Sequence, residues 1–302
     1  EHTARIGWYK GPTVVEALSI KGREALVLEW EHGPNAAHDS ETYKRTLEKA
    51  ARTPSKAVRD DGDTMGALAR AKRRVEAEYY LPYLAHATME PLVATARIVD
   101  GHCEIWAPVQ APQWARDNVA AHLGFKPEQV TVNVTLLGGG FGRKSKSDFV
   151  SEAALVSKEM GGKPVKLQWT RDDDLRHGYY HAVALERLEA ALDAQGKPVA
   201  WLHRSAAPSI GATFSLENKM LRPLEMGMTA INVPYAIPNV RVESPEVAAH
   251  TRIGWFRSVY NIPHAFAVQC FVNELAVAAR PEPKDYLVEL LGADRPIGPR
   301  TF

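Results

Sequence analysis

The sequence predicts an α+β fold, and three observations lead to that prediction. Two pairs of β-prone runs, within 94–106 and within 187–205, are each split by a short turn, as in β-hairpins. Helical patterns occur as well, and at Pro263–Ala279 the apolar residues follow a period of about 3.6 residues. The chain has 302 residues, 45% of them hydrophobic, which is enough to bury a sizeable core.

The first 74 residues are expected to form a smaller unit. A polar segment from His32 to Asp63 separates its short apolar runs from the strand-like residues that follow. In chain order we expect strands at 13–15 and 25–30 with a helical stretch at 14–21 between them, helices at 40–51 and 64–74, and a solvated loop at 59–63.

A larger α+β unit is expected from residue 75 to the end. Asp100-Gly101 forms the turn of its first hairpin, because both residues tolerate a positive φ angle. Pro112 suits the first turn of a helix and Gly124 its end. The remaining elements are strands at 75–83, 130–137 and 164–169, a second hairpin across 194–197, a helix that ends at Gly161, and helices at 263–279 and 284–291.

Charge and cysteine content exclude several classes of protein. Lys and Arg number 37 and Asp and Glu 36, so the net charge of +1 gives no support for a nucleic-acid or membrane-surface binder. Cys103 and Cys270 are the only cysteines, too few for a disulfide framework or an iron–sulfur site, and we expect buried thiols. No apolar run approaches the length of about 18 residues that spans a membrane.

A glycine-rich turn at 138–142 is the most informative stretch of the chain. The β-branched run 130–137 stops at three glycines; Phe141 and Gly142 follow, and then a basic patch of Arg143, Lys144 and Lys146. Without a Cβ atom, glycine lets bare backbone N–H groups approach an anion or a cofactor. The spacing fits neither a Walker A nor a G-x-G-x-x-G motif, and a turn without any ligand remains an alternative.

Two polar side chains elsewhere are candidate site residues. Gln110 follows a strand and precedes a helix; its amide could orient an oxo or carbonyl oxygen, or simply bond to nearby backbone. Arg257 lies among Trp255, Phe256 and Val259, where a buried guanidinium would need a partner, since an unpaired buried charge costs about 3–5 kcal/mol. That partner is a substrate carboxylate, a developing oxyanion or a structural carboxylate.

Histidines and acidic residues offer weaker candidates. His177 and His181 are four residues apart, but Gly178 argues against the helix that a zinc site with this spacing requires. His86 and Glu90 form either an acid–base pair or a structural pair. The acidic run 172–174 is expected in a solvated turn, where it caps backbone N–H groups.

Five segments, taken in order, resemble one protein family. They are YLPYLAHATMEP, EIWAPVQAPQWAR, VTVNVTLLGGGFGRKSKSDFVSEAA, PVKLQWTRDDDLRHGYYHA and GWFRSVYNIPHAFAVQCFVNELAVAA. They are similar to the molybdopterin-binding large subunit of the xanthine oxidase family, in the branch of isoquinoline 1-oxidoreductase β subunits and bacterial membrane-associated aldehyde dehydrogenases. The resemblance implies the end of an α/β hammerhead module at 1–74 and the first part of the molybdopterin-binding domain at 75–302.

The resemblance also implies roles for single residues. Gln110 would hydrogen-bond an oxo ligand of molybdenum, and Phe141 would wall the substrate pocket. Arg257 would orient the substrate and stabilise negative charge, an electrostatic contribution of about 3 kcal/mol in other enzymes. No protein ligand to the metal is expected. The cofactor-binding residues would be Gln110, Gly139, Gly140, Phe141, Gly142, Arg143 and Arg257.

The activity implied by the resemblance is hydroxylation of an aldehyde or an N-heterocycle with oxygen from water. The cofactor would be molybdopterin cytosine dinucleotide with molybdenum, and electrons would leave through 2Fe-2S clusters on a separate iron–sulfur small subunit. Bacterial relatives of this branch are often exported, which implies a periplasmic or inner-membrane-associated protein.

Two features depart from the family pattern. The family's catalytic glutamate lies in a Gly-Glu motif, and its opening segment has a Gly-Gln-Gly pattern; this sequence contains neither. We therefore expect a middle piece of the large subunit, active only when further polypeptide supplies the glutamate. The alternatives are a cofactor-free member of the fold that binds a ligand or a partner, and a non-redox hydrolase.

Overall fold

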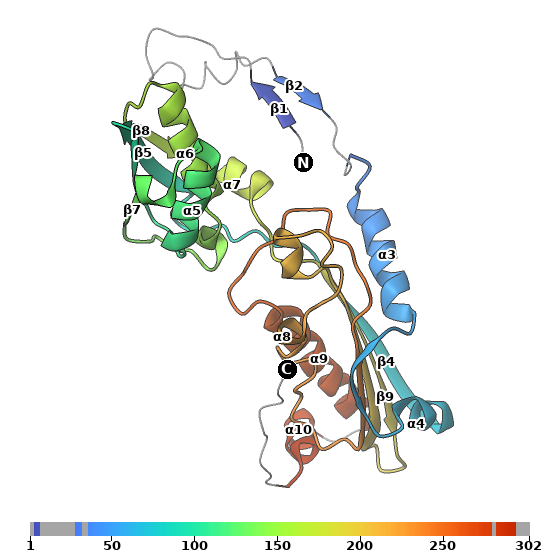
Figure 1. Cartoon of the computed structure of the whole chain (residues 1–302). Coiled ribbons are helices and arrows are strands. Elements are labelled where there is room, and N and C mark those ends of the chain that lie inside the picture. Colours follow the sequence, from blue (N-terminus) through green and yellow to red (C-terminus); the bar gives the residue numbers. More distant parts are fainter. Residues whose placement is uncertain (1–2, 7–27, 32–35, 280–281, 294–302) are drawn as a thin grey trace. The chain divides into compact units, whose positions relative to one another are not determined.

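The computed structural model of this chain describes residues 3–6, 28–31, 36–279 and 282–293 (Figure 1). The chain divides into two compact units, residues 1–46 and 47–302, so the division falls within one helix.

The first unit contains a small sheet and the start of that helix. Strand β1 (Thr3–Ile6) pairs antiparallel with β2 (Leu28–Glu31), and α3 (Ser40–Arg52) follows. Strand β2 overlaps the strand expected at 25–30, and α3 confirms the helix expected at 40–51. The strand and the helix expected within 13–21 lie outside the described residues.

The second unit is built on a five-stranded mixed sheet. Its strand order is β3-β11-β10-β9-β4, in which β10 and β11 are parallel and all other neighbours are antiparallel. The hairpin predicted across 194–197 is confirmed. The strands are β3 (Ala57–Asp61), β4 (Arg73–Leu81), β9 (Ala184–Leu192), β10 (Pro198–Ala206) and β11 (Asn239–Glu243).

Strand β3 corrects one prediction. Residues 59–61, expected in a solvated loop, pair with β11 instead. Asp60 forms an ion pair with Arg241 at 2.5 Å, so its charge is balanced across the sheet. The expected unit boundary at residue 74 also differs from the division in the structure, because β3 and β4 both belong to this sheet. Helix α4 (Thr64–Arg70) is shorter than expected, since β4 begins soon after it.

Helices α9 (Asn261–Ala279) and α10 (Pro283–Leu291) cover one face of this sheet (Figure 1). In the core beneath them, Trp201 contacts the rings of Phe271 and Tyr235 at centroid distances of 5.2 and 5.8 Å. Burying one large apolar side chain completely contributes about 1.5–3 kcal/mol. By length and composition alone α9 could cross a membrane, which the sequence did not lead us to expect. Its buried side chains pack into this core, as in the core helix of a globular domain.

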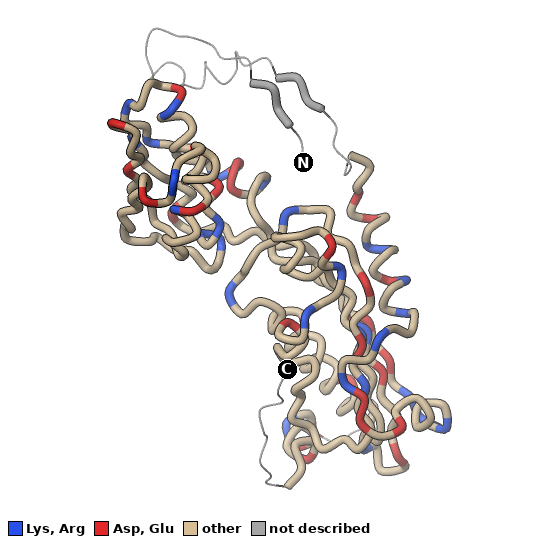
Figure 2. Tube along the Cα trace, in the orientation of Figure 1, with Lys and Arg blue, Asp and Glu red and all other residues tan. Residues whose placement is uncertain are grey.

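The opposite face of the five-stranded sheet carries a continuous network of ion pairs. Basic and acidic residues lie close together along the strands of this sheet (Figure 2). Its centre is buried: the side chains of Arg204 and Glu243, 2.5 Å apart, are 4% and 1% exposed. Helix α4 covers the adjoining area, where Leu68 packs near Ala200 and Leu202. The network joins five arginines, Arg52, Arg74, Arg187, Arg204 and Arg241, to five carboxylates, Asp60, Glu76, Glu78, Glu189 and Glu243.

A second, four-stranded mixed sheet carries the glycine-rich turn. Its order is β7-β6-β5-β8, with β6 and β7 parallel, and α5 (Pro112–Leu123) and α6 (Asp148–Glu159) pack against it. The predicted hairpin turn is confirmed, with φ angles of 48° at Asp100 and 73° at Gly101. Gly124 ends α5 as predicted, with φ 72°. The strands are β5 (Val93–Val99), β6 (His102–Ala107), β7 (Val130–Val134) and β8 (Val165–Gln168).

Two short helices, α7 (Arg171–His177) and α8 (Pro223–Met226), complete the regular elements of the described residues. The acidic run 172–174 lies in the first turn of α7, where Asp173 caps the helix as expected. Asp174 is buried and pairs with Arg171, so this part of the run is not solvated. The two mixed sheets with their flanking helices confirm the α+β class.

Candidate functional site

The glycine-rich turn leads from β7 towards α6 through a left-handed course. Gly139, Phe141 and Gly142 have φ angles of 98°, 52° and 101°, and a 3-10 turn over Arg143–Ser145 follows. Non-glycine residues seldom adopt a positive φ, yet Phe141 does so while its side chain stays 45% exposed. The turn therefore presents an aromatic ring at the surface.

Gln110 lies in the connection between β6 and α5 and is joined to this turn. The side-chain Oε1 of Gln110 accepts a hydrogen bond from the Gly142 N–H at 2.9 Å. The backbone N–H of Gln110 donates to the Lys144 carbonyl at 2.9 Å. A backbone N–H can only donate, so the side-chain oxygen must face Gly142. The Gln110 Nε2 group then has no hydrogen-bond partner among the described residues. A Cβ on Gly140 would lie 2.4 Å from Oε1, so a side chain at this position would displace the Gln110 amide.

The segment Trp255–Val259 packs directly against the same turn. The Arg257 N–H donates to the Phe141 carbonyl at 2.8 Å. A Cβ on Gly142 would meet the Trp255 carbonyl oxygen at 2.0 Å, closer than any real contact. The sequence thus brings three predicted residues, Gln110, Phe141 and Arg257, to one place through contacts between backbones.

These residues surround a hollow of about 330 Å³. Arg257 is exposed at its edge, and within the described part of the chain its guanidinium has no ion-pair partner. The assumption that Arg257 is buried is therefore wrong. Its apolar sequence neighbours pack inward while the side chain of Arg257 remains accessible. The lining residues are Gln110, Phe141, Gly142, Trp255, Phe256, Arg257, Ser258 and Val259.

An ion pair holds the base of the glycine-rich turn. The Lys144 side chain is fully buried, and its Nζ lies 2.5 Å from Glu90 Oε2, which also accepts the Gly138 N–H at 2.9 Å. Burial acts to raise the pKa of Glu90, but the hydrogen bonds from Lys144 and Gly138 outweigh it, and the pKa is lowered. The Glu90 carboxylate therefore stays charged at neutral pH, and its contacts with Lys144 and Gly138 fix the start of the turn.

The expected basic patch is not a surface patch. Arg143 is buried and forms a two-pronged ion pair with Asp148 at 2.9 and 2.7 Å, so its guanidinium is engaged within the fold. Lys146 lies about 5 Å from three aromatic ring centroids, including those of Phe214 and Trp255. The sequence predicts that Arg143 and Lys146 are basic side chains, but it does not predict which groups they contact.

Two of the three candidate histidines, His86 and His181, contact backbone carbonyls through their rings. His86 and Glu90 do not form a pair: His86 Nε2 lies 2.7 Å from the Trp255 carbonyl oxygen, whereas Glu90 binds Lys144. Helix α7 ends at His177, so His177 and His181 do not share one helix. Among the described residues, no group of three or more His, Cys, Asp or Glu side chains could hold a metal ion.

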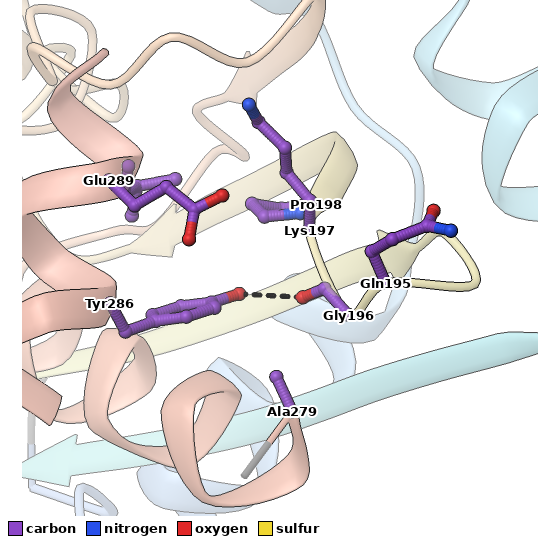
Figure 3. Close-up of a pocket in the computed structure, with 8 residues that line it drawn as sticks. Gln195, Gly196, Lys197, Pro198, Ala279, Tyr286 and Glu289 are labelled. Atoms are coloured by element: carbon purple, nitrogen blue, oxygen red, sulfur yellow. Dashed lines mark hydrogen bonds between the residues drawn. The ribbon is translucent and has the colours of Figure 1, made fainter. Parts of the chain in front are cut away.

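A second hollow, of about 370 Å³, lies between α10 and the turn after β9 (Figure 3). There the Tyr286 hydroxyl donates to the Gly196 carbonyl at 3.1 Å, which joins the helix to the hairpin. None of the predicted site residues lines this hollow. No motif in the sequence predicts this hollow. No motif predicts the contact between His86 and the Trp255 carbonyl either.

Comparison with known proteins identifies the fold. The family described as molybdopterin cofactor-binding domain matches residues 48–285. One of the subunits of nicotinate dehydrogenase from Pseudomonas putida is 27% identical over 288 residues, which are 93% of this chain and 24% of that protein. The membrane-bound aldehyde dehydrogenase (pyrroloquinoline-quinone) of Gluconacetobacter polyoxogenes is 30% identical over 296 residues, or 94% of this chain and 38% of that protein.

The structural comparison agrees. The aldehyde oxidoreductase of Desulfovibrio gigas aligns with a TM-score of 0.70 and 21% identity, over 91% of this chain and 30% of that one. At this identity the likeness shows the fold alone. The chain spans about a quarter to two fifths of the length of the two curated relatives named above. It belongs to the molybdopterin cofactor-binding domain family, as part of a large subunit of the xanthine oxidase type.

Proposed function

We propose that this chain is part of the large subunit of a molybdenum hydroxylase that oxidises an aldehyde or an N-heterocycle. One observation carries the proposal: the Gln110 amide and the Arg257 guanidinium, whose donor groups have no side-chain partner in the described residues, line one hollow beside Phe141. Relatives named for nicotinate, aldehyde and isoquinoline oxidation support this substrate range.

The residues present fit the metal end of a molybdopterin cofactor. A free amide N–H on Gln110, beside the glycine-rich turn, suits an oxygen ligand. When bound, the cofactor supplies a redox metal that activates water-derived oxygen and accepts electrons. We infer that it is the cytosine dinucleotide form. The G. polyoxogenes relative is named for pyrroloquinoline quinone, but the family match favours molybdopterin.

This chain's own residues bind and orient the substrate in the proposed reaction. Phe141 supplies an exposed aromatic wall for a flat ring or an apolar aldehyde. Arg257 reaches the same hollow with a permanent positive charge, which stabilises negative charge on the substrate oxygen or ring nitrogen. Arg143 serves the fold, because its buried guanidinium binds Asp148 and its backbone N–H donates to the Gly140 carbonyl at 2.9 Å.

The proposed reaction also needs groups from outside this chain. No carboxylate is among the described residues that line the hollow. We propose that further polypeptide of the large subunit supplies the general base. We propose that an iron–sulfur small subunit with 2Fe-2S clusters removes the electrons. A periplasmic or inner-membrane-associated location in a bacterium is part of the same proposal.

Two substitutions test the roles of the site residues in the complete protein. Arg257→Ala and Gln110→Ala should each lower turnover about 100-fold, the loss expected when one electrostatic contact to the transition state is removed. The melting temperature should change little in Arg257→Ala, whose side chain is exposed, and only modestly in Gln110→Ala, which loses the hydrogen bond from the Gly142 N–H. Turnover with an aldehyde or N-heterocycle and thermal unfolding are measured side by side.

Arg116→Ala is the matched control for these substitutions. Arg116 is an exposed arginine on α5 whose only described ion pair, with Asp117, is long at 3.5 Å. This variant should keep full turnover. Parallel losses of turnover and stability in Arg257→Ala and Gln110→Ala would instead show that the two residues are purely structural.

A further inference from the structure

The segment that carries Arg257 has a backbone that needs support. Ser258 and Val259 have φ angles of 74° and 48°. A β-branched residue is strongly disfavoured in this region, and such a conformation costs about 1–3 kcal/mol, so it persists only where the surroundings determine it. The groups that hold Trp255–Val259 in place therefore decide where Arg257 lies.

Two histidines from distant parts of the chain bind the two ends of this segment. His86 Nε2 lies 2.7 Å from the Trp255 carbonyl oxygen, and His181 Nε2 lies 3.3 Å from the Val259 carbonyl oxygen. A carbonyl oxygen can only accept, so each imidazole must carry its proton on Nε2. These two carbonyls stand on either side of Arg257 in the sequence.

The same two imidazoles enclose the side chain of Phe256. The His86 ring stacks on it with a centroid distance of 4.6 Å, and the His181 ring meets it edge-on at 5.9 Å. Each histidine therefore makes two contacts with the segment, one to a carbonyl and one to the ring between the carbonyls. Phe256 is thereby fixed next to Arg257.

Both imidazoles are suited to donate without adding a buried charge. Burial lowers the pKa of His86 to about 4, with Arg143 and His181 adding to the effect against the Trp255 carbonyl. Burial also lowers the pKa of His181. At neutral pH each ring is uncharged and keeps one N–H for its carbonyl.

We propose that His86 and His181 are positioning residues that clamp the backbone of Trp255–Val259 and so present Arg257 to the hollow. On the opposite side the segment is held by the Arg257 N–H to the Phe141 carbonyl and by the close contact at Gly142. The Arg257 side chain stays exposed at the hollow. The consequence for activity rests on the function proposed above, whereas the clamp itself does not.

The first test measures backbone hydrogen exchange over 255–259 in the complete protein. His86→Phe keeps a ring beside Phe256 but removes the donor, and His86→Gln restores a donor at about the same place. Exchange should rise at least about 10-fold in His86→Phe and stay close to wild type in His86→Gln. His102→Phe is the control, because His102 is exposed on β6. Should His86→Phe not fold, His181→Phe and His181→Gln give the same comparison.

A second test asks whether the clamp acts through Arg257. His86→Phe should lower kcat/KM about 10-fold in the wild-type background and cause little further loss in Arg257→Ala. Unchanged exchange in both His→Phe variants, or losses that simply multiply in the double variant, would overturn the proposal. Faster exchange in a protein that lacks all hydroxylase activity would support the clamp and overturn only the proposed function.

Discussion

Gly142 shows at the scale of one residue why this position of the turn admits no side chain. Its φ is 101°, which favours glycine, and its missing Cβ leaves room for the Trp255 carbonyl. The two constraints are independent, because the first concerns local backbone geometry and the second a contact with a segment more than 100 residues away.

Gly142→Ala should therefore destabilise the protein more than a glycine replacement under only one of these constraints. Gly161 has φ 69° and no atom within 4 Å of the position that a Cβ would occupy, so Gly161→Ala has only the backbone penalty of about 1–2 kcal/mol. We expect Gly142→Ala to lose at least about 2 kcal/mol more, measured by chemical unfolding. Similar losses in the two variants would contradict the described contact with Trp255.

His86 gives a prediction about pH. Its pKa is about 4 in the folded protein and about 6.5 when unfolded. Between these values the unfolded chain binds a proton that the folded protein does not, so stability falls as the pH is lowered from 6.5 towards 4. His86 should account for about 2–3 kcal/mol of the loss between pH 7 and pH 4.5.

The measurement compares unfolding free energies of wild type and His86→Gln at these two pH values. His181 and His264, whose pKa values burial also lowers, are common to both proteins and cancel in the difference. An equal loss in both proteins would show that His86 is not held neutral by the fold.

At the scale of elements, the ion-pair network unites strands that are distant in the sequence. Glu243 on β11 binds Arg204 on β10 and Arg241 on its own strand, each at 2.5 Å, and accepts the Ser55 N–H at 3.0 Å. Burial acts to raise the pKa of Glu243, but these hydrogen bonds outweigh it and the pKa is lowered. The carboxylate is thus charged and fully partnered.

Glu243→Gln should destabilise the five-stranded sheet by about 3 kcal/mol, because it leaves the buried guanidinium of Arg204 with a weaker partner. The control is Arg70→Gln, which breaks an exposed pair with Asp63 and should cost less than about 1 kcal/mol. The free energies of unfolding of both variants are measured by chemical denaturation and compared with that of wild type. Equal, small effects would mean that the network does not stabilise the sheet.

Elements whose signals are local could be predicted from the sequence. The turn at Asp100-Gly101 and the end of α5 at Gly124 depend on backbone preferences of the residues themselves, and both are confirmed. Strand β3 could not be predicted in this way. Its charged composition indicates a loop, and its actual partner, β11, lies about 180 residues further along the chain.

The sequence likewise predicts part of the candidate site but not all of it. Gln110, Phe141 and Arg257 were chosen from motifs, and the structure brings them around one hollow. The burial of Arg143 and the carbonyl contact of His86 were not predicted. Each depends on a partner that carries no recognisable pattern, such as the Trp255 carbonyl 169 residues from His86.

At the scale of the whole molecule, we propose that further polypeptide completes the site to which this chain contributes. The chain spans 24% and 38% of the two curated relatives named above. Its hollow supplies an amide, an aromatic wall and a guanidinium, but no carboxylate among the described residues. In the proposed reaction, the base comes from further polypeptide.

The most direct test is the molybdenum content of the complete, natively purified protein that contains this chain. We predict close to one molybdenum atom per large subunit, together with a pterin dinucleotide released on denaturation. We also predict that Gly142→Ala lowers this content. A complete, folded protein without molybdenum or pterin would contradict the proposed chemistry and favour the cofactor-free alternative.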